Sequence, residues 1–184
     1  MFSTILITGG CRSGKSGHAL SLASQVQGMR KLFVATCVAE DEEMRRRVQR
    51  HQKERGRDWQ TLEEPVDLVH AIQREGPGAD LILVDCLTLW VSNLMVQHPV
   101  DTTFLDRLEN LCQVIARPPC PLIFVTNEVG AGIVPENTLA RRFRDLTGWA
   151  NQHVAAACTK VIWMVAGIAV TIKPGKDGAE GRRA

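Results

Sequence analysis

The sequence "TILITGGCRSGKS", residues 4–16, gives the clearest indication of the fold of this chain. An apolar, β-branched run is followed by a glycine-rich turn and then by a segment that favours a helix over 15–26. The turn fits the pattern G-x-x-x-x-G-K-[ST] through Gly9, Gly14, Lys15 and Ser16. Because strand, glycine loop and helix follow one another in the required order, we predict a phosphate-binding loop.

The chemistry of such a loop assigns a role to each of its residue types. Glycines let successive backbone N–H groups face a phosphate, and the positive end of the following helix attracts the anion. Lys15 is expected to reach the β and γ phosphates, and the Ser16 hydroxyl to bind the Mg²⁺ that accompanies GTP or ATP. The expected nucleotide contacts are Gly9, Gly10, Cys11, Arg12, Ser13, Gly14, Lys15 and Ser16. The alternative is a glycine-rich turn that holds no ligand.

Further apolar runs recur along the chain at 32–36, 81–85, 122–126 and 161–165. Between them lie segments that favour helices over 40–55, 65–74, 86–97, 102–116 and 137–158. This alternation predicts an α/β fold, a single P-loop NTPase domain with a mostly parallel sheet and helices on both faces. The segment "IAVTIK" follows a glycine and is expected to add an antiparallel edge strand. We assign 1–173 to this domain and 174–184, rich in glycine and charge, to a disordered tail.

Composition is that of a folded globular protein. The chain has 184 residues, of which 45% are hydrophobic and 23% charged, with a net charge of +2. This charge does not favour nucleic acid as a partner. The first ten residues lack the basic start of a signal peptide, and no run is long enough to span a membrane, so a cytoplasmic protein is expected. The six cysteines form no C-x-x-C pair and are interpreted as buried or neutral thiols, with Cys11 filling space in the loop.

Asp85 ends the buried run "LILVD" and is the second candidate site residue. A carboxylate at the carboxyl end of such a strand holds Mg²⁺ in P-loop enzymes, directly or through water. An N-cap of the following helix is the alternative.

The stretch "EDEEMRRRVQRHQKERGRDW", residues 40–59, crowds seven Lys and Arg around His51. Because it follows the run 32–36, it starts at the sheet edge where the phosphate loop is expected to lie. Neighbouring arginines disfavour the imidazolium, so His51 is expected to be neutral and able to act as a base or nucleophile. A solvated helix face is the alternative.

The segment "TNEVGAGIVPENTLARRFRDLTGWANQ", 126–152, also begins at a strand's carboxyl end and is a binding candidate. Asn137 is expected to cap a helix whose apolar face carries Leu139, Phe143, Leu146, Ala150, Val154 and Cys158. Ligand or subunit contact and a solvated basic face are both open for Arg141, Arg142 and Arg144.

Together, "TGGCRSGKS", "FVATC", the histidine stretch and "TNEVGAGIVPEN" closely resemble the bifunctional adenosylcobinamide kinase / adenosylcobinamide-phosphate guanylyltransferase family, over residues 4 to about 173. The resemblance implies two reactions in the assembly of coenzyme B12. A nucleoside triphosphate first phosphorylates adenosylcobinamide. GTP then guanylylates a histidine with release of pyrophosphate, and the cobinamide phosphate takes the GMP to give adenosylcobinamide-GDP.

The resemblance also implies site residues and a partner. The guanylylated histidine corresponds to His51, and further nucleotide contacts correspond to Ala35, Thr36, Cys37, Gln52, Lys53, Glu54, Arg55, Glu63 and Asp85. A homotrimer is implied as well. Two departures stand out: Asp85 replaces the Glu of some relatives, which leaves metal or guanosine as its contact, and Gly56 stands where Pro is common.

Three other functions remain as alternatives at this stage. The nearest is a small-molecule P-loop kinase in which His51 takes no part. A GTP-binding switch is less favoured, because the chain offers "TNEVG" where such proteins usually carry N-K-x-D. A nucleic-acid-binding module would require strongly salt-dependent binding through the arginine-rich stretch.

Overall fold

The computed structural model describes residues 3–38, 59–97 and 101–175, which form a seven-stranded sheet in the order β3-β2-β4-β5-β1-β6-β7. The strands are β1 (Thr4–Gly9), β2 (Lys31–Ala35), β3 (Trp59–Glu63), β4 (Leu81–Asp85), β5 (Leu122–Val125), β6 (Lys160–Val165) and β7 (Ile168–Lys173). All neighbours pair in parallel except β6 and β7. The mostly parallel sheet with an antiparallel edge is confirmed.

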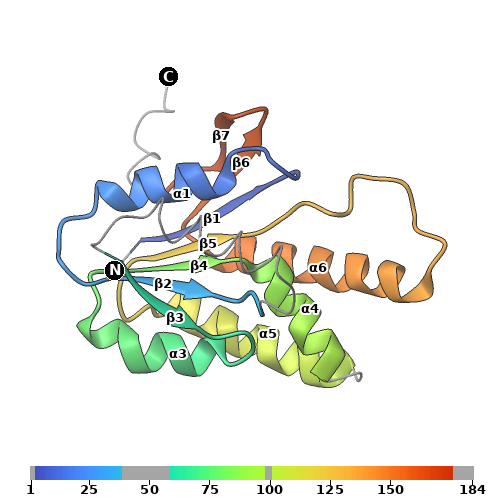
Figure 1. Cartoon of the computed structure of the whole chain (residues 1–184), viewed down its shortest axis with the longest axis horizontal. Coiled ribbons are helices and arrows are strands. Elements are labelled where there is room, and N and C mark those ends of the chain that lie inside the picture. The colour runs from blue at the N-terminus through green and yellow to red at the C-terminus, as the bar shows by residue number, and fades with distance from the viewer. Residues whose placement is uncertain (1–2, 39–58, 98–100, 176–184) are drawn as a thin grey trace.

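The described helices cover both faces of the sheet, as predicted. They are α1 (Lys15–Ser24), α3 (Leu68–Glu75), α4 (Leu87–Gln97), α5 (Asp101–Ala116) and α6 (Thr138–Ala157). Helix α1 lies on one face, and α3 to α6 lie on the other (Figure 1). The helix predicted over 40–55 and the tail from 176 onward are outside the described residues. Among the described helices, none is both long and apolar enough to cross a bilayer.

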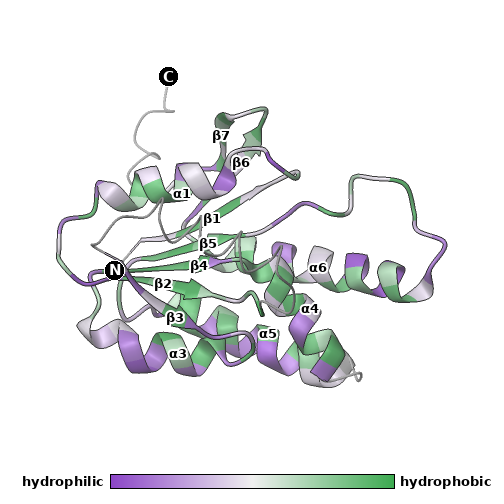
Figure 2. Ribbon diagram, viewed as in Figure 1, coloured by the Kyte–Doolittle hydropathy of each residue, from purple (hydrophilic) through white to green (hydrophobic). Residues whose placement is uncertain are grey.

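Alternation along the strands sorts side chains into two hydrophobic cores. Leu6, Val34, Val84 and Phe124 belong to the core beneath α3 to α6, whereas Ile7, Phe33, Leu83 and Val125 belong to the core beneath α1. The central strands are hydrophobic along their length (Figure 2), which is typical of a parallel sheet covered on both faces. A residue's position along its strand therefore determines which face its side chain occupies.

Strand β3 was not predicted from the sequence. It pairs with β2 from Lys31↔Trp59 to Ala35↔Glu63, and its residues are only partly buried because it is an edge strand. Trp59 packs edge-to-face on Phe33, with ring centroids 6.2 Å apart. Few apolar residues are needed at such an edge, so "WQTLE" lacks the apolar run that marked the other strands.

The predicted helix over 65–74 was wrong at its start, because α3 begins at Leu68. Glu64 Oε1 accepts hydrogen bonds from the backbone N–H groups of Val66 (3.1 Å) and Asp67 (2.7 Å). This local bonding forms a turn ahead of the helix.

A two-residue turn joins β6 to β7. Ala166 and Gly167 both have positive φ, at 49° and 83°, as a tight hairpin turn requires. Strand β7 has its other edge open among the described residues, and it exposes the apolar side chains Ile168, Val170 and Ile172.

Helix α6 begins as the sequence predicts, since the Asn137 side chain accepts a hydrogen bond from Ala140 N at 3.1 Å. Leu146, Ala150, Val154 and Cys158 are buried, but Leu139 is 60% exposed and its predicted place on the buried face was wrong. The first turns of α6 and the loop before it project beyond the body of the molecule (Figure 1). Leu139 therefore has no core to pack against.

Candidate active site

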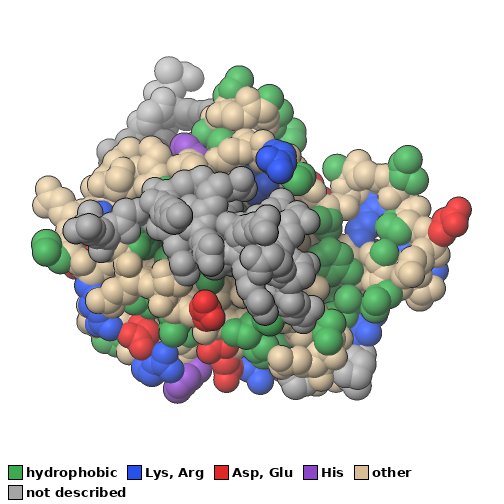
Figure 3. Space-filling view, viewed as in Figure 1, with side chains coloured by type: hydrophobic (Ala, Val, Ile, Leu, Met, Phe, Trp, Pro, Cys, Tyr) green, Lys and Arg blue, Asp and Glu red, His purple; other side chains and the backbone are tan. Residues whose placement is uncertain are grey.

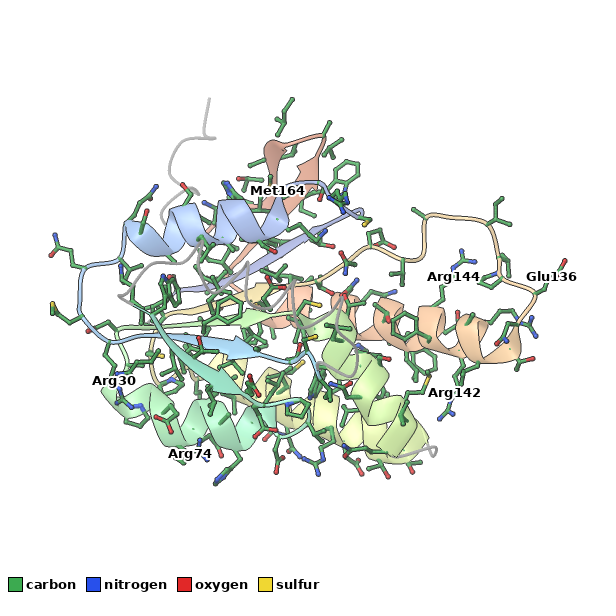
Figure 4. The ribbon with its side chains drawn as sticks, viewed as in Figure 1. Arg30, Arg74, Glu136, Arg142, Arg144 and Met164 are labelled. Carbon is green, nitrogen blue, oxygen red and sulfur yellow. The ribbon has the colours of Figure 1, made fainter. Side chains whose placement is uncertain are left out.

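The phosphate loop lies between β1 and α1 and needs its glycines for backbone reasons. At Gly9, φ is +152°, and an added Cβ would lie 2.4 Å from the carbonyl oxygen of Met164, which Figure 4 labels. Gly14 has φ of +94° and precedes α1 without a side-chain cap. The first N–H groups of α1 are thus free of side-chain capping, as an anion site at a helix N-terminus requires.

Two backbone hydrogen bonds hold the loop against its neighbours. The Ser13 carbonyl accepts from Gly167 N at 3.1 Å, which ties the loop to the β6–β7 turn. The Gly9 carbonyl accepts from Glu128 N at 3.0 Å, which ties it to the chain after β5. The cradle is therefore fixed by elements distant in sequence.

Lys15 is folded over the loop and is only 7% exposed. Its Nζ donates to the Gly10 carbonyl at 2.5 Å and to Ser13 Oγ at 3.4 Å. Burial lowers the pKa of Lys15, and the nearby Asp85 carboxylate partly opposes that shift. A partly desolvated ammonium attracts phosphate oxygens more strongly than one in bulk water.

Ser16 and Asp85 meet on the α1 side of the sheet. Ser16 Oγ on α1 donates to Asp85 Oδ2 at the end of β4, at 2.8 Å. A hydroxyl and a carboxylate are the hard oxygen ligands that Mg²⁺ prefers. These two residues, predicted separately from the sequence, therefore fit a magnesium site.

The strand register lines up further predicted residues with Asp85. Glu63 pairs with Ala35, Ala35 with Asp85, Asp85 with Val125, and Val125 with Ile7. Side chains in one register row share a face, and Ala35, Val125 and Ile7 belong to the core on the α1 side. The predicted contacts Ala35, Glu63 and Asp85 thus share the face on which Lys15 and Ser16 lie.

Thr36 makes its hydrogen bonds within the protein. It is fully buried, and its hydroxyl donates to the Cys86 carbonyl at 2.7 Å and accepts from Cys86 N at 2.8 Å. Its own carbonyl accepts from Asn93 Nδ2 at 2.8 Å. Thr36 therefore braces the turn that follows Asp85.

Five predicted site residues of the histidine stretch lie outside the described residues: His51, Gln52, Lys53, Glu54 and Arg55. The flanks of this stretch are described. The chain leaves β2 at the carboxyl edge of the parallel sheet, which is also the edge of the phosphate loop, and returns at Trp59 to begin β3.

A partly buried hydrogen-bond network that the sequence did not reveal lies below the start of the loop 126–137. Thr126 Oγ1 donates to Asn151 Oδ1 at 2.7 Å, and Asn151 Nδ2 donates to the Asn127 carbonyl at 3.1 Å. Asn127 N donates to Thr88 Oγ1 at 2.7 Å. The network joins α4, α6 and the end of β5, so the base of the loop is rigidly held. Polar residues inside otherwise apolar helix faces were its only signal in the sequence.

Two arginines of α6 brace the same loop. Arg141 Nη1 donates to the carbonyls of Pro135 (3.0 Å) and Glu136 (2.5 Å), and Arg144 Nη2 donates to the Gly130 carbonyl at 2.5 Å. Figure 4 shows Arg144 between α6 and the loop, with Arg142 on the other side of the helix. This bracing role of Arg141 and Arg144 was not predicted, and ligand or subunit contact stays a prediction for the three arginines.

The cysteines are free thiols, mostly in apolar surroundings. Burial raises the pKa of Cys86 to about 12, of Cys158 to about 12 and of Cys120 to about 11. The predicted burial of these three thiols is confirmed, whereas Cys11 is exposed and does not fill space within the loop. The described part of the chain holds no group of three or more His, Cys, Asp or Glu suited to a metal ion.

Comparison with solved structures supports the fold. The flagellar accessory protein FlaH of Methanocaldococcus jannaschii aligns with a TM-score of 0.50 and 14% identity, over 94% of this chain and 79% of FlaH. The resemblance extends to the fold alone at this level of identity. The chain accordingly has the P-loop NTPase fold that its strand order and glycine loop indicate.

Comparison with known sequences is more specific. The chain is 41% identical to the bifunctional adenosylcobalamin biosynthesis protein CobP of Pseudomonas aeruginosa, over 91% of this chain and 96% of CobP. It is 38% identical to the protein CobU of the same description from Escherichia coli, over 92% and 99% of the two chains. The family model described as cobinamide kinase / cobinamide phosphate guanyltransferase matches residues 5–172. The chain therefore belongs to the cobinamide kinase / cobinamide phosphate guanyltransferase family.

Proposed function

We propose that this protein phosphorylates adenosylcobinamide with ATP or GTP and then transfers GMP from GTP to adenosylcobinamide phosphate, in the biosynthesis of cobalamin. The observation that carries the proposal is the Ser16–Asp85 hydrogen bond beside the buried Lys15, at the phosphate loop of a chain from this family. The relatives' names describe bifunctional proteins of adenosylcobalamin biosynthesis.

In the kinase step, the hydroxyl oxygen of the cobinamide side arm attacks the γ-phosphorus. The bond from that phosphorus to the β–γ bridging oxygen breaks, the nucleoside diphosphate keeps the electron pair, and the hydroxyl proton leaves to solvent. The loop N–H groups and Lys15 stabilise the phosphate charge. Ser16 and Asp85 would hold Mg²⁺, which supplies further charge neutralisation when bound.

In the second step, we assign His51 as the nucleophile. An imidazole nitrogen attacks the α-phosphorus of GTP, a phosphorus–nitrogen bond forms, and pyrophosphate leaves. A phosphate oxygen of adenosylcobinamide phosphate then displaces the histidine, which gives adenosylcobinamide-GDP. Support for this assignment comes from the family match, which spans His51, and from the chain leaving β2 at the phosphate-loop edge.

The remaining nucleotide contacts follow the register row. We propose that Ala35, Cys37 and Glu63 form the floor beyond the phosphates, with Gln52, Lys53, Glu54 and Arg55 completing the site. The shared face of Ala35, Glu63 and Asp85 supports this arrangement. Of the two contacts left open for Asp85, metal or guanosine, we propose the metal, and the hydrogen bond from Ser16 to Asp85 supports this choice.

We further propose that the protein assembles as a homotrimer. Two separate surfaces expose apolar side chains, one on the projecting loop and start of α6 (Ile133, Val134, Leu139) and one along β7 (Ile168, Val170, Ile172). Figure 3 shows hydrophobic side chains at both places. Two different surfaces suit a head-to-tail contact, which forms a closed ring when the rotation between neighbouring subunits is one third of a turn. Analytical ultracentrifugation should give three times the chain mass of 20.3 kDa.

The kinase proposal is tested with γ-labelled GTP or ATP and adenosylcobinamide. We expect label in adenosylcobinamide phosphate and none without Mg²⁺. Nucleotide hydrolysis that is indifferent to added cobinamide would contradict the proposal.

The guanylyltransferase proposal is tested with α-labelled GTP. Acid-labile, alkali-stable label should appear on the wild-type protein and be lost in His51→Ala, with His70→Ala, an exposed histidine of α3, as the matched control. Phosphorylation of cobinamide without any protein label would favour the alternative, a small-molecule kinase in which His51 takes no part.

A further inference from the structure

We propose that Asn127 is a further catalytic residue, whose carboxamide donates a hydrogen bond to the γ-phosphoryl group as it moves to the cobinamide hydroxyl. This inference rests on the proposed kinase step. It comes from the position and surroundings of Asn127, which the sequence motifs had left without a role.

The first step concerns the direction of the side chain. The parallel ladder between β1 and β5 continues beyond Val125, because Thr126 N donates to the Ile7 carbonyl and Glu128 N to the Gly9 carbonyl, each at 3.0 Å. Alternation therefore continues as well. Thr126 points toward α4 and α6, where it meets Thr88 and Asn151. Asn127 accordingly points to the opposite face, that of α1.

The second step concerns what lies beside Asn127 on that face. Strand β5 lies between β1, which leads into the phosphate loop, and β4, which ends at Asp85. Val125 pairs with Ile7 on one side and with Asp85 on the other. Asn127 follows Val125 by two residues. It therefore lies nearer the carboxyl end of the parallel strands, beside Gly9. It thus lies between the phosphate cradle and the metal-site carboxylate, at the end where the γ-phosphate meets its acceptor.

The third step concerns preorganisation. The backbone of Asn127 is held on both sides, by Thr88 Oγ1 on its N–H and by Asn151 Nδ2 on its carbonyl. Its carboxamide, by contrast, makes no hydrogen bond to any other residue that the structure describes, and the residue is partly buried. A donor on a fixed backbone needs little reorganisation when charge develops beside it.

The carboxamide needs to supply only one hydrogen bond. Asn127 Nδ2 donates to a γ-phosphoryl oxygen that gains charge in the transition state, and it neither takes nor gives a proton. The bonds made and broken are those of the kinase step: acceptor oxygen to γ-phosphorus, and γ-phosphorus to bridging oxygen. Thr88 and Asn151 act as positioning residues through the Asn127 backbone.

The test compares Asn127→Ala and Asn127→Asp with Gln152→Ala, an exposed carboxamide on α6. We expect Asn127→Ala to lower kcat for adenosylcobinamide phosphorylation about 10²-fold while the KM for nucleotide changes less than about threefold. Asn127→Asp keeps the shape but loses the donor and adds negative charge, so it should be at least as impaired. Gln152→Ala should match the wild type.

A structural role would give a different pattern, with a lower unfolding temperature and loss of both activities. We expect an unchanged unfolding temperature and labelling by α-labelled GTP within about threefold of the wild type, because the α-phosphorus is not the atom transferred in the kinase step. The inference about Asn127 would be overturned, and the proposed function kept, if the wild type is active and kcat of Asn127→Ala stays within threefold of it. Activity in Asn127→Asp would have the same meaning. A wild type that phosphorylates no cobinamide would instead overturn the proposed function.

Discussion

Two faces of the same sheet edge use polar residues in opposite ways. Beside α4 and α6, Thr36, Thr88 and Thr126 are buried and each hydroxyl bonds within the protein. On the face beneath α1, Lys15, Ser16 and Asp85 gather where a nucleotide is proposed to bind. Neighbours in sequence, such as Thr126 and Asn127, fall on different faces. At this edge, therefore, position along the chain matters more than residue type in separating supporting residues from those proposed to meet the nucleotide.

The largest expected effect comes from the α1 face, at Lys15. Lys15→Met should lower kcat for phosphoryl transfer by about 10²- to 10³-fold, because it removes a cation that meets the transferring phosphate. Burial lowers the pKa of Lys15, so the ammonium carries a desolvation cost that methionine lacks, and the unfolding temperature should not fall. Steady-state kinetics and thermal unfolding check both parts. Lys31→Met, at the start of β2, is the control that should stay active.

The second-largest effect on activity is expected at Asp85. Asp85→Asn should lower kcat about 10²-fold at fixed Mg²⁺ and shift the activity to higher Mg²⁺ concentration, because an amide is a weaker ligand than a carboxylate. An Mg²⁺ titration of the kinase rate measures the shift. An unchanged Mg²⁺ dependence would assign Asp85 to a role other than the metal.

The supporting residues beside α4 and α6 are tested at Thr36, where a substitution should change stability and not activity. Thr36→Val keeps the shape but leaves Cys86 N–H and its carbonyl without the hydroxyl, so the free energy of unfolding should fall by about 1–3 kcal/mol. Denaturant unfolding measures this loss, with Thr61→Val on the exposed edge strand expected within about 0.5 kcal/mol of wild type. If folded Thr36→Val lost as much activity as Asp85→Asn, the proposed difference between the two faces would be wrong.

The smallest effect is expected far from both faces, at the helix cap. Asn137→Ala removes the acceptor for Ala140 N and should cost about 1 kcal/mol of unfolding free energy. Kinase activity should be unchanged at temperatures where the protein is folded. Chemical denaturation with the same kinetic assay separates the two quantities.

Much of this fold was predictable because its central strands are continuous apolar runs and its phosphate loop follows a strict residue pattern. Strand β3 was not predicted because an edge strand needs little apolar surface. The start of α3 was predicted too early because Glu64 bonds to the backbone just ahead of the helix. Lys15, Ser16 and Asp85 were found because their roles depend on residue type at fixed spacing.

Other parts of the site depend on contacts that spacing alone does not encode. Thr36 belongs to a motif of predicted nucleotide contacts, and that contact stays a prediction. The bonds of its hydroxyl to the backbone of Cys86, 50 residues away, exist only once β2 and β4 pair. Asn151 lies 24 residues from Asn127, and their hydrogen bond exists only once α6 packs on the sheet. Arg141 and Arg144 bond to a loop whose path the sequence did not specify.

A crystal structure with Mg²⁺ and a non-hydrolysable triphosphate would show whether the α1 face of this edge binds the nucleotide. We predict the β-phosphate in the Gly9–Ser16 loop, Ser16 and Asp85 at the ion, and Asn127 Nδ2 within about 3.2 Å of a γ-phosphate oxygen. A triphosphate bound elsewhere, with Ser16 and Asp85 still bonded to each other and no ion beside them, would contradict the account.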